Sequence, residues 1–181
     1  EAKQAALYIA KAAVCEGENK PCNKCKQCSM ANANSNPDIL YISPEDGKKN
    51  ISVNQIRKIR QSAFIKPHSA DKKVFIIEDA ERMNEQAQNA LLKVLEDPPQ
   101  SVIFILCAAS KTMLLTTVCS RCTVLSLNVP DFKSALSAVI KITGADTNTT
   151  KAVLESRGNN IGLAIKEINK ESESEALSVA R

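Results

Sequence analysis

KVFIIEDAERMNEQAQNALLKVLEDPPQSVIFIL, residues 73–106, is the part of this sequence from which the architecture can be predicted most directly. Val74–Ile77 and Val102–Leu106 are continuously apolar, as is typical of strands buried on both faces of a parallel sheet. Between them, residues 84–96 place apolar side chains at helical spacing, with Asn84 as a candidate cap and two prolines beyond the end as a stop. The stretch therefore predicts a strand, a helix and a second strand.

The same alternation extends outward in both directions. Ile39–Ile42 and Thr123–Leu127 are two further apolar runs and are predicted as strands. Helical spacing occurs in residues 4–14 and 52–64, and more weakly in residues 111–118. Because helices alternate with strands, the fold class is predicted as α/β, with a parallel sheet flanked by helices.

The pattern changes near Pro130, because no strand-like run follows it. Helical segments are predicted, in order, at residues 131–142, 148–157 and 160–170. The sequence therefore predicts an α/β domain over residues 1–129 and a small helical domain over residues 130–181.

The composition limits the classes of protein to which the chain can belong. Of its 181 residues, 44% are hydrophobic and 24% are charged, which argues against a fibrous or disordered chain. The net charge of +4 is too small to indicate nucleic-acid binding by itself. Aromatic residues make up 3%, with no Trp, which argues against recognition of bases by stacking. No bilayer-spanning run or signal peptide is recognised, so a cytoplasmic location without membrane contact is expected.

Cys15, Cys22, Cys25 and Cys28 form the pattern C-x6-C-x2-C-x2-C. Four closely spaced thiolates can converge on one tetrahedral centre, the ligand set that Zn²⁺ prefers where its role is structural. Free thiols and a pair of disulfides are the alternatives, and disulfides fit poorly with a cytosolic chain. The spacing therefore predicts a structural zinc site, with no ligand position left open for a reacting water.

Two further features have both a functional and an ordinary interpretation. Glu78 and Asp79 follow a buried strand, where nucleotide-hydrolysing α/β proteins place carboxylates that hold Mg²⁺ and polarise water, although solvated acids are common there too. Arg121, in the sequence Ser-Arg-Cys, is either a surface charge or a ligand for phosphate, which a neighbouring subunit could hold. Spacing alone does not choose between these interpretations.

Three motifs of the chain resemble those of bacterial clamp-loader subunits of the AAA+ family. Residues 89–99, NALLKVLEDPP, look like the family signature NALLKxLEEPP, and Ser120–Cys122 matches its SRC motif. The cysteines match a zinc module that such subunits insert after their first helix. The resemblance covers essentially the whole chain and implies a nucleotide-binding-like α/β domain, with the zinc module at residues 15–28, followed by a helical lid domain. It also implies a fragment that lacks an N-terminal phosphate loop and a C-terminal collar.

Within this family, the delta prime type of subunit is favoured over the gamma/tau motor type. The motor's strand ends in Asp-Glu, whereas Glu78-Asp79 reverses the order and misplaces both carboxylates. Cys107-Ala108-Ala109 offers no sensor hydroxyl, and Ile161 falls where the lid's sensor arginine is expected. Glu1-Ala2-Lys3 lacks the Gly-Lys-Thr/Ser pattern of a phosphate loop. The alternative is a gamma/tau motor ATPase in which Glu78 and Asp79 function despite their reversed order. A third interpretation, a generic zinc-ribbon protein that binds nucleic acid, leaves the motifs at residues 89–99 and 120–122 unexplained.

For a delta prime type of subunit, a stator, the resemblance implies that Arg121 acts in trans as an arginine finger on ATP held by an adjacent gamma/tau subunit. It implies no productive binding of ATP and Mg²⁺ by this chain, which would still be part of the DNA polymerase III holoenzyme. The other implied partners are the delta subunit, primer–template DNA and, indirectly, the sliding clamp. Lys48, Lys49 and Asn50, just before the helix predicted at Ser52, are candidate DNA contacts, with a solvated basic face as the alternative.

Overall fold

The computed structural model describes the backbone of residues 2–179 and the side chains of residues 2–170. The chain divides into two compact units, Glu1–Leu125 and Ser126–Arg181. This division falls close to the boundary expected after residue 129. None of the described helices is long and apolar enough to cross a bilayer.

Three parallel strands form the sheet of the first unit, in the order β1–β2–β3. The strands are β1 (Ile39–Ile42), β2 (Lys73–Ile77) and β3 (Val102–Leu106). Every residue of β2 is buried, as expected for a central strand covered on both faces. The sheet confirms the predicted α/β fold class, and its strands begin and end within one residue of the three apolar runs in the sequence.

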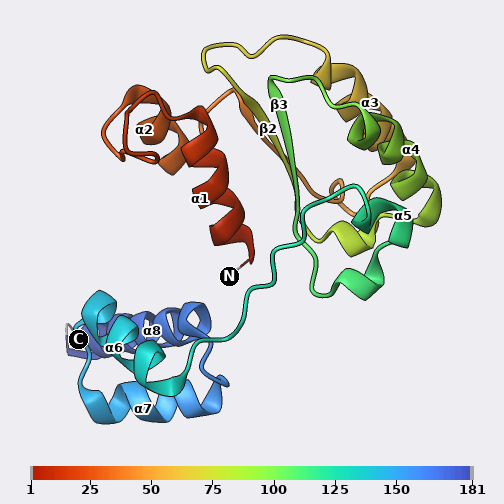
Figure 1. Cartoon of the computed structure of the whole chain (residues 1–181). Coiled ribbons are helices and arrows are strands. Elements are labelled where there is room, and N and C mark those ends of the chain that lie inside the picture. The colour runs from red at the N-terminus through yellow and green to blue at the C-terminus, as the bar shows by residue number, and fades with distance from the viewer. Residues whose placement is uncertain (1, 180–181) are drawn as a thin grey trace. The chain divides into compact units, whose positions relative to one another are not determined.

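Helices cover both faces of this sheet (Figure 1). One face carries α1 (Ala2–Val14) and α2 (Lys26–Asn32), and the other carries α3 (Val53–Ala63) and α4 (Glu85–Glu96). The alternating side chains of β2 contribute to two cores, because Val74 and Ile76 pack with α1 whereas Phe75 and Ile77 pack with α3 and α4. Phe75 also stacks on Phe104 of β3, with ring centroids 5.1 Å apart.

Polar side chains fix the first turns of α3 and α4. The Ser52 hydroxyl accepts the N–H of Gln55, and the Gln55 side chain accepts the N–H of Ser52, which together form a capping box. Asn84 caps α4 by accepting the N–H of Ala87 at 2.9 Å, as the sequence predicts. The helix ends at Glu96, shortly before the two prolines.

One predicted strand is not formed in the described structure. Thr123–Leu127 has no regular secondary structure, and the side chains of Val124, Leu125 and Leu127 are exposed. A strand requires a neighbour that takes up its backbone hydrogen bonds, and none lies beside this segment among residues 2–179. The strand prediction for residues 123–127 was therefore wrong.

Short helical turns follow β2 and β3. They are η1 (Ala80–Arg82), η2 (Lys111–Met113) and α5 (Thr116–Cys119). The helix predicted over residues 111–118 is broken into η2 and α5, because the backbones of Leu114 and Leu115 are extended between them. This brings Arg121, which follows α5, to the side of α4.

The described part of the second unit contains helices and no strand. They are α6 (Phe132–Thr143), α7 (Thr147–Ser156) and α8 (Ile161–Val179). Asp131 and Asp146 cap the first turns of α6 and α7, and Gly144 ends α6 with a φ of 69° that favours glycine. Val139 and Leu154 are buried in the core that the three helices share.

Candidate functional site

The four predicted zinc ligands come together at one point of the first unit. Cys15 follows α1, Cys22 lies in the connecting loop, Cys25 caps α2 and Cys28 lies in its first turn. Their sulfur atoms all lie within 4.8 Å of one another, the grouping that a single metal ion requires. Cys15 and Cys28 are buried, and none of the chain's cysteines forms a disulfide.

The electrostatics of this cluster suit a metal ion. The sulfur of Cys15 accepts the backbone N–H of Cys22 at 3.3 Å. Backbone N–H groups, first that of Lys24 and then that of Cys25, lower the pKa of Cys22 to about 6. Burial raises the pKa of Cys28 to about 12, so that thiol needs a cation beside it to ionise at neutral pH. Zn²⁺ supplies such a charge to a cysteine ligand set.

The loop of the cluster closes tightly at Gly17. A Cβ atom at this position would lie 2.7 Å from the Cβ and 2.9 Å from the Sγ of Cys22. Both distances are shorter than a normal van der Waals contact, so any side chain would displace Cys22. The backbone thus forms a close cradle around the four sulfur atoms, and the residues present fit a structural Zn²⁺ ion.

A buried polar network joins this cysteine module, residues 15–28, to the sheet. Gln27, which is 2% exposed, donates from its amide to the carbonyl and hydroxyl oxygens of Ser69, both at 3.2 Å. Asn36 donates to the side-chain oxygen of Gln27 at 2.9 Å and accepts the N–H of Asp38 at the same distance. These residues were not predicted from the sequence, in which the one signal for them is the polar Asn-Pro-Asp turn just before β1.

Asp38 is fully buried at the start of β1. Its carboxylate accepts backbone N–H groups from His68, Ser69 and Ala70. Burial by itself would raise the pKa of Asp38, but these N–H groups together hold the pKa below its ordinary value. Asp38 therefore fixes the loop between α3 and β2 against the first strand.

Glu78 and Asp79 lie together at the carboxyl end of β2 and face a lysine that the sequence analysis did not select as a partner. Lys3 Nζ lies 3.1 Å from Glu78 Oε2 and 3.7 Å from Asp79 Oδ1. Arg82 Nε lies 3.7 Å from the other carboxylate oxygen of Asp79. The hydrogen bond to Glu78 raises the pKa of Lys3, which keeps the ammonium charged.

In this arrangement an ammonium competes for the carboxylates that would serve the Mg²⁺ ion implied by a nucleotide-binding fold. Mg²⁺ approaches carboxylate oxygens to about 2.0–2.1 Å and retains a full octahedral shell. Here the ammonium of Lys3 already lies against both Glu78 and Asp79, so the chain neutralises its own carboxylates. Glu1, the first of the three residues that lack the phosphate-loop pattern, lies outside the described residues.

Arg121 lies just beyond α5 and contacts the end of α4. Its Nε donates to Glu96 Oε1 at 3.0 Å, and its Nη2 lies 2.7 Å from the same oxygen. Nη1 donates to the carbonyl oxygen of Thr117 at 2.9 Å. The side chain is still 34% exposed, so a further ligand can reach the guanidinium.

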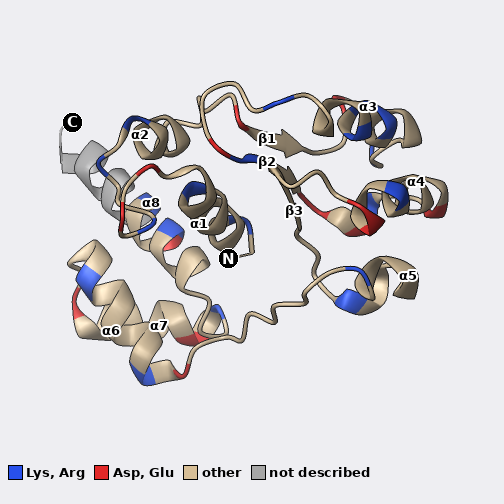
Figure 2. Cartoon of the chain, turned by 45° about the horizontal axis from the view of Figure 1, so that its top comes forward, with Lys and Arg blue, Asp and Glu red and all other residues tan. Residues whose placement is uncertain are grey.

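Lys48, Lys49 and Asn50 are exposed in the loop before α3. Lys48 forms an ion pair with Glu45. Figure 2 shows further lysine or arginine positions, coloured blue on the ribbon, along α3, which continues from this loop. The predicted site residues thus form separate groups: the cysteines between α1 and α2, the acids after β2, the arginine after α5 and the basic loop before α3.

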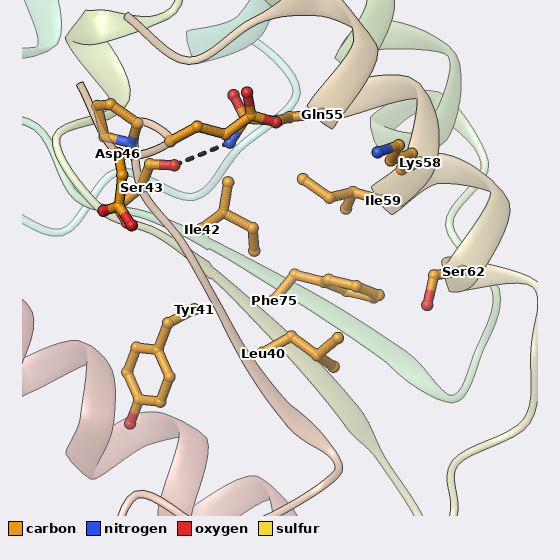
Figure 3. Close-up of a pocket in the computed structure, with 12 residues that line it drawn as sticks. Leu40, Tyr41, Ile42, Ser43, Asp46, Gln55, Lys58, Ile59, Ser62 and Phe75 are labelled. Atoms are coloured by element: carbon orange, nitrogen blue, oxygen red, sulfur yellow. Dashed lines mark hydrogen bonds between the residues drawn. The ribbon is translucent and has the colours of Figure 1, made fainter. Parts of the chain in front are cut away.

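An open cavity of about 610 Å³ lies beside the free edge of β1 (Figure 3). Ile42, Ile59 and Phe75 form its apolar part, and at one end Gln55 Nε2 donates to the carbonyl oxygen of Ser43 at 2.9 Å. None of the predicted site residues lines this cavity. Its lining combines these apolar side chains with charged ones, among them Glu45, Asp46 and Lys58.

A family model described as DNA polymerase III, delta subunit, matches residues 1–131. DNA polymerase III subunit delta′ of Haemophilus influenzae is 42% identical over 118 residues, which cover 65% of this chain and 36% of that protein. Subunit delta′ of Escherichia coli is 29% identical over 147 residues, with 81% of this chain and 44% of that protein covered. Subunit tau of Bacillus subtilis is 38% identical over 120 residues, which cover 65% of this chain and 21% of that protein. The chain thus spans less than half the length of these relatives.

Two solved structures agree with the predicted AAA+ fold. A gamma subunit-related protein from Thermotoga maritima aligns with a TM-score of 0.51 and 25% identity, over 86% of this chain and 61% of that one. A RuvB variant from Thermotoga maritima aligns with a TM-score of 0.59 over 84% of this chain and 51% of that one, and at 13% identity it shows the fold alone. By the family model and these relatives, the chain belongs to the DNA polymerase III delta subunit family and corresponds, over this part of its length, to the delta′ subunits.

Proposed function

We propose that this chain is part of a delta′ subunit of the DNA polymerase III clamp loader and acts as a stator without ATPase activity of its own. The observation that carries the proposal is the ion pair of Lys3 with Glu78 and Asp79, because an ammonium there neutralises the carboxylates that would serve Mg²⁺. The similarity to delta′ subunits supports the same assignment. As part of the holoenzyme, the chain would promote ATP hydrolysis on a neighbouring subunit and so help to load the sliding clamp.

Arg121 is the residue through which the chain acts on that neighbour. Its guanidinium is planar, permanently charged and partly exposed, which suits it to bind phosphate oxygens of ATP held by a gamma/tau subunit. Negative charge is spread over the transferring phosphoryl group, and an arginine supplied in trans stabilises that charge. Because the arginine comes from another chain, hydrolysis depends on correct assembly of the complex.

The cysteine module has a structural role in this proposal. Cys15, Cys22, Cys25 and Cys28 would hold Zn²⁺, which supplies a fixed tetrahedral centre and no reacting water when all its ligands are cysteines. The cysteines themselves join the end of α1 to the start of α2. Gln27 then ties α2 to the loop before β2.

Lys48, Lys49 and Asn50 are the proposed contacts to the phosphate backbone of primer–template DNA. They are exposed and precede the first turn of α3, where the helix dipole favours negative charge. Contacts of this kind position a protein on DNA without reading its sequence. The gamma/tau and delta subunits are the proposed direct partners, and the sliding clamp is reached through them.

A gamma/tau motor subunit is the second candidate. The similarity to subunit tau of Bacillus subtilis favours it, and so does the presence of two carboxylates after β2. For this candidate, Lys3 would have to leave Glu78 and Asp79 when Mg²⁺ and ATP bind. Magnesium-dependent turnover by the full protein alone, abolished by Glu78→Ala, would establish the motor in place of the stator.

DNA-stimulated ATP hydrolysis by an assembled clamp loader that contains the full protein tests the proposal. Arg121→Ala is expected to lower kcat by roughly tenfold or more, as loss of an arginine finger does. Arg157→Ala, which removes the arginine of another surface Arg–Glu pair, is the matched control and should leave the rate unchanged. An unchanged rate with Arg121→Ala would show that the arginine-finger role is wrong.

A further inference from the structure

Helix α4 holds the segment that leads to Arg121 at two places. Gln88, which is 5% exposed, accepts the N–H of Leu115 at 2.8 Å and donates to the carbonyl oxygen of Met83 at 3.1 Å. This fixes the residue before α5 against the first half of α4. Glu96, the last residue of α4, contacts Arg121 just beyond the end of α5.

The contact between Glu96 and Arg121 uses one particular side of the guanidinium. Nε and Nη2 share Glu96 Oε1, at 3.0 and 2.7 Å. Nη1 donates to the carbonyl oxygen of Thr117 at 2.9 Å and makes a longer contact of 3.4 Å with the hydroxyl of Ser120. The protein therefore holds the guanidinium from two directions.

These contacts do not use every N–H of the Arg121 guanidinium. A guanidinium carries five N–H groups in one plane. Within the part of the chain that the structure describes, one N–H of Nη2 has no acceptor, and the contact with Ser120 is the longest that Nη1 makes. This N–H of Nη2 can donate to an oxygen of a phosphate.

The carboxylate that holds Arg121 belongs to Glu96, and the helix that carries it, α4, packs against the sheet. Leu91 and Val94, on the same helix as Glu96, are buried against the sheet. Pro98 and Pro99 restrict the backbone immediately beyond it. Because interiors are closely packed, the backbone of Glu96 is fixed by the core beneath α4.

We propose that Glu96 is the positioning residue of Arg121 and sets the guanidinium so that the remaining N–H of Nη2 is presented to a phosphate of a nucleotide on the neighbouring subunit. The inference rests on the proposed function, since Arg121 must reach such a phosphate. An unrestrained arginine loses rotamer entropy when it binds. The contact with Glu96 already restricts the rotamers of Arg121, so less rotamer entropy is lost when the phosphate binds. Groups that are pre-organised in this way speed a reaction.

Glu96 does not compete with the phosphate, because among the described contacts its carboxylate leaves one N–H of Nη2 without an acceptor. Both anions can therefore contact Arg121 at the same time. A carboxylate bound to the remaining N–H of Nη2 would be a competitor that has to leave first. The two cases lead to opposite results, since removal of a positioning carboxylate slows hydrolysis and removal of a competitor speeds it.

The test compares DNA-stimulated ATP hydrolysis by assembled clamp loaders that contain the full protein or a variant. Glu96→Ala is expected to lower kcat about fivefold with little change in the KM for ATP, the factor that corresponds to an exposed ion pair of about 1 kcal/mol. Glu96→Gln keeps an acceptor oxygen and should lose less. Glu85→Gln, an exposed carboxylate at the other end of α4, is the matched control and should change nothing. No loss, or a gain, with Glu96→Ala would overturn the proposal.

Two further measurements separate this proposal from the proposed function. The double variant Glu96→Ala/Arg121→Ala should be no slower than Arg121→Ala alone, because Glu96 acts through the arginine; a larger loss overturns the positioning role. In the full protein without partners, NMR relaxation of the Arg121 Nε–H group should show a more mobile side chain in Glu96→Ala. The mobility of this group should be unchanged in Glu85→Gln. An unchanged NMR signal overturns the positioning role, whereas an unchanged ATPase rate with Arg121→Ala overturns the arginine-finger function itself.

Discussion

Gln27 and Ser69 are joined across 42 residues of sequence by hydrogen bonds from the Gln27 amide to the carbonyl and hydroxyl oxygens of Ser69. The same amide lies 3.3 Å from the carboxylate of Glu16, in the loop of the cysteine module. Asp38 accepts the N–H of Ser69 at 2.8 Å. The cysteine module, the loop before β2 and the start of β1 are therefore connected through largely buried polar atoms.

Gln27→Ala is expected to destabilise the folded chain by about 1–3 kcal/mol, because it removes hydrogen bonds of a buried amide and leaves the buried Asn36 without one of its acceptors. Asn36 loses the side-chain oxygen to which it donates, and Ser69 loses the amide that donates to it. Urea unfolding followed by circular dichroism should show a lower midpoint with an unchanged slope. Gln61→Ala, on the exposed surface of α3, is the control. Equal losses in the two variants would contradict a special role for the network.

Asp38 is expected to make the stability of the folded chain depend on pH at acid values. Its folded-state pKa lies below the unfolded value of about 3.9, so its contribution is full above that value and is lost as pH falls through the folded pKa. Asp38→Asn should lower the free energy of unfolding by roughly 2 kcal/mol at neutral pH and weaken its dependence on pH in acid. Asp71→Asn, an exposed carboxylate, is the control for unfolding curves taken from neutral to acid pH. If both variants showed the same dependence of the unfolding free energy on pH, that dependence could not be assigned to Asp38.

Removal of zinc is expected to destabilise the first unit, since a metal that binds the folded cysteine module stabilises that state by mass action. The parent chain should carry one Zn²⁺ by elemental analysis, and Cys28→Ser should lose it because one of four ligands is gone. Cys119→Ser, outside the cluster, should retain the metal and the melting temperature. A parent chain without zinc, or equal loss in both variants, would contradict the site.

Lys3→Ser is expected to expose Glu78 and Asp79 to divalent cations, because it removes the ammonium that pairs with them. Mn²⁺, a paramagnetic substitute for Mg²⁺, should then bind about fivefold more tightly, the effect of losing an exposed ion pair. Water-proton relaxation with increasing Mn²⁺ measures the affinity. Lys11→Ser, which removes a lysine of the same helix that contacts Asn32, is the control. If the parent and Lys3→Ser bind Mn²⁺ equally, Lys3 does not neutralise the acids.

The sheet could be predicted from the sequence because a buried parallel strand is a short apolar run whatever surrounds it. Ile39–Ile42 and Val102–Leu106 are strands with the predicted bounds. The convergence of the cysteines was predictable too, because four residues within a short loop are held near one another by the chain itself. Thr123–Leu127 was predicted wrongly because an apolar run does not reveal whether a neighbouring strand exists.

The polar partners could not be predicted, because each is set by contacts between distant parts of the chain. Lys3 meets Glu78 across 75 residues, and Arg121 meets Glu96 across 25. By sequence alone these are ordinary surface charges, and only the stacking of helices on the sheet selects which ones pair. Glu96 does lie within the recognised motif NALLKVLEDPP, which is the one signal that could have singled it out.

The exposed stretch TVLSLNV, residues 123–129, is expected to promote association between copies of the chain at high concentration. It carries no charge, is rich in residues that favour strands, and is followed by Pro130. Leu125 and Leu127 are 68% and 55% exposed, so their apolar surfaces are open to other molecules. Uncharged segments of this kind pair with their counterparts in neighbouring chains. Light scattering should therefore rise with concentration, and Leu125→Lys should suppress that rise by placing a charge at the point of contact.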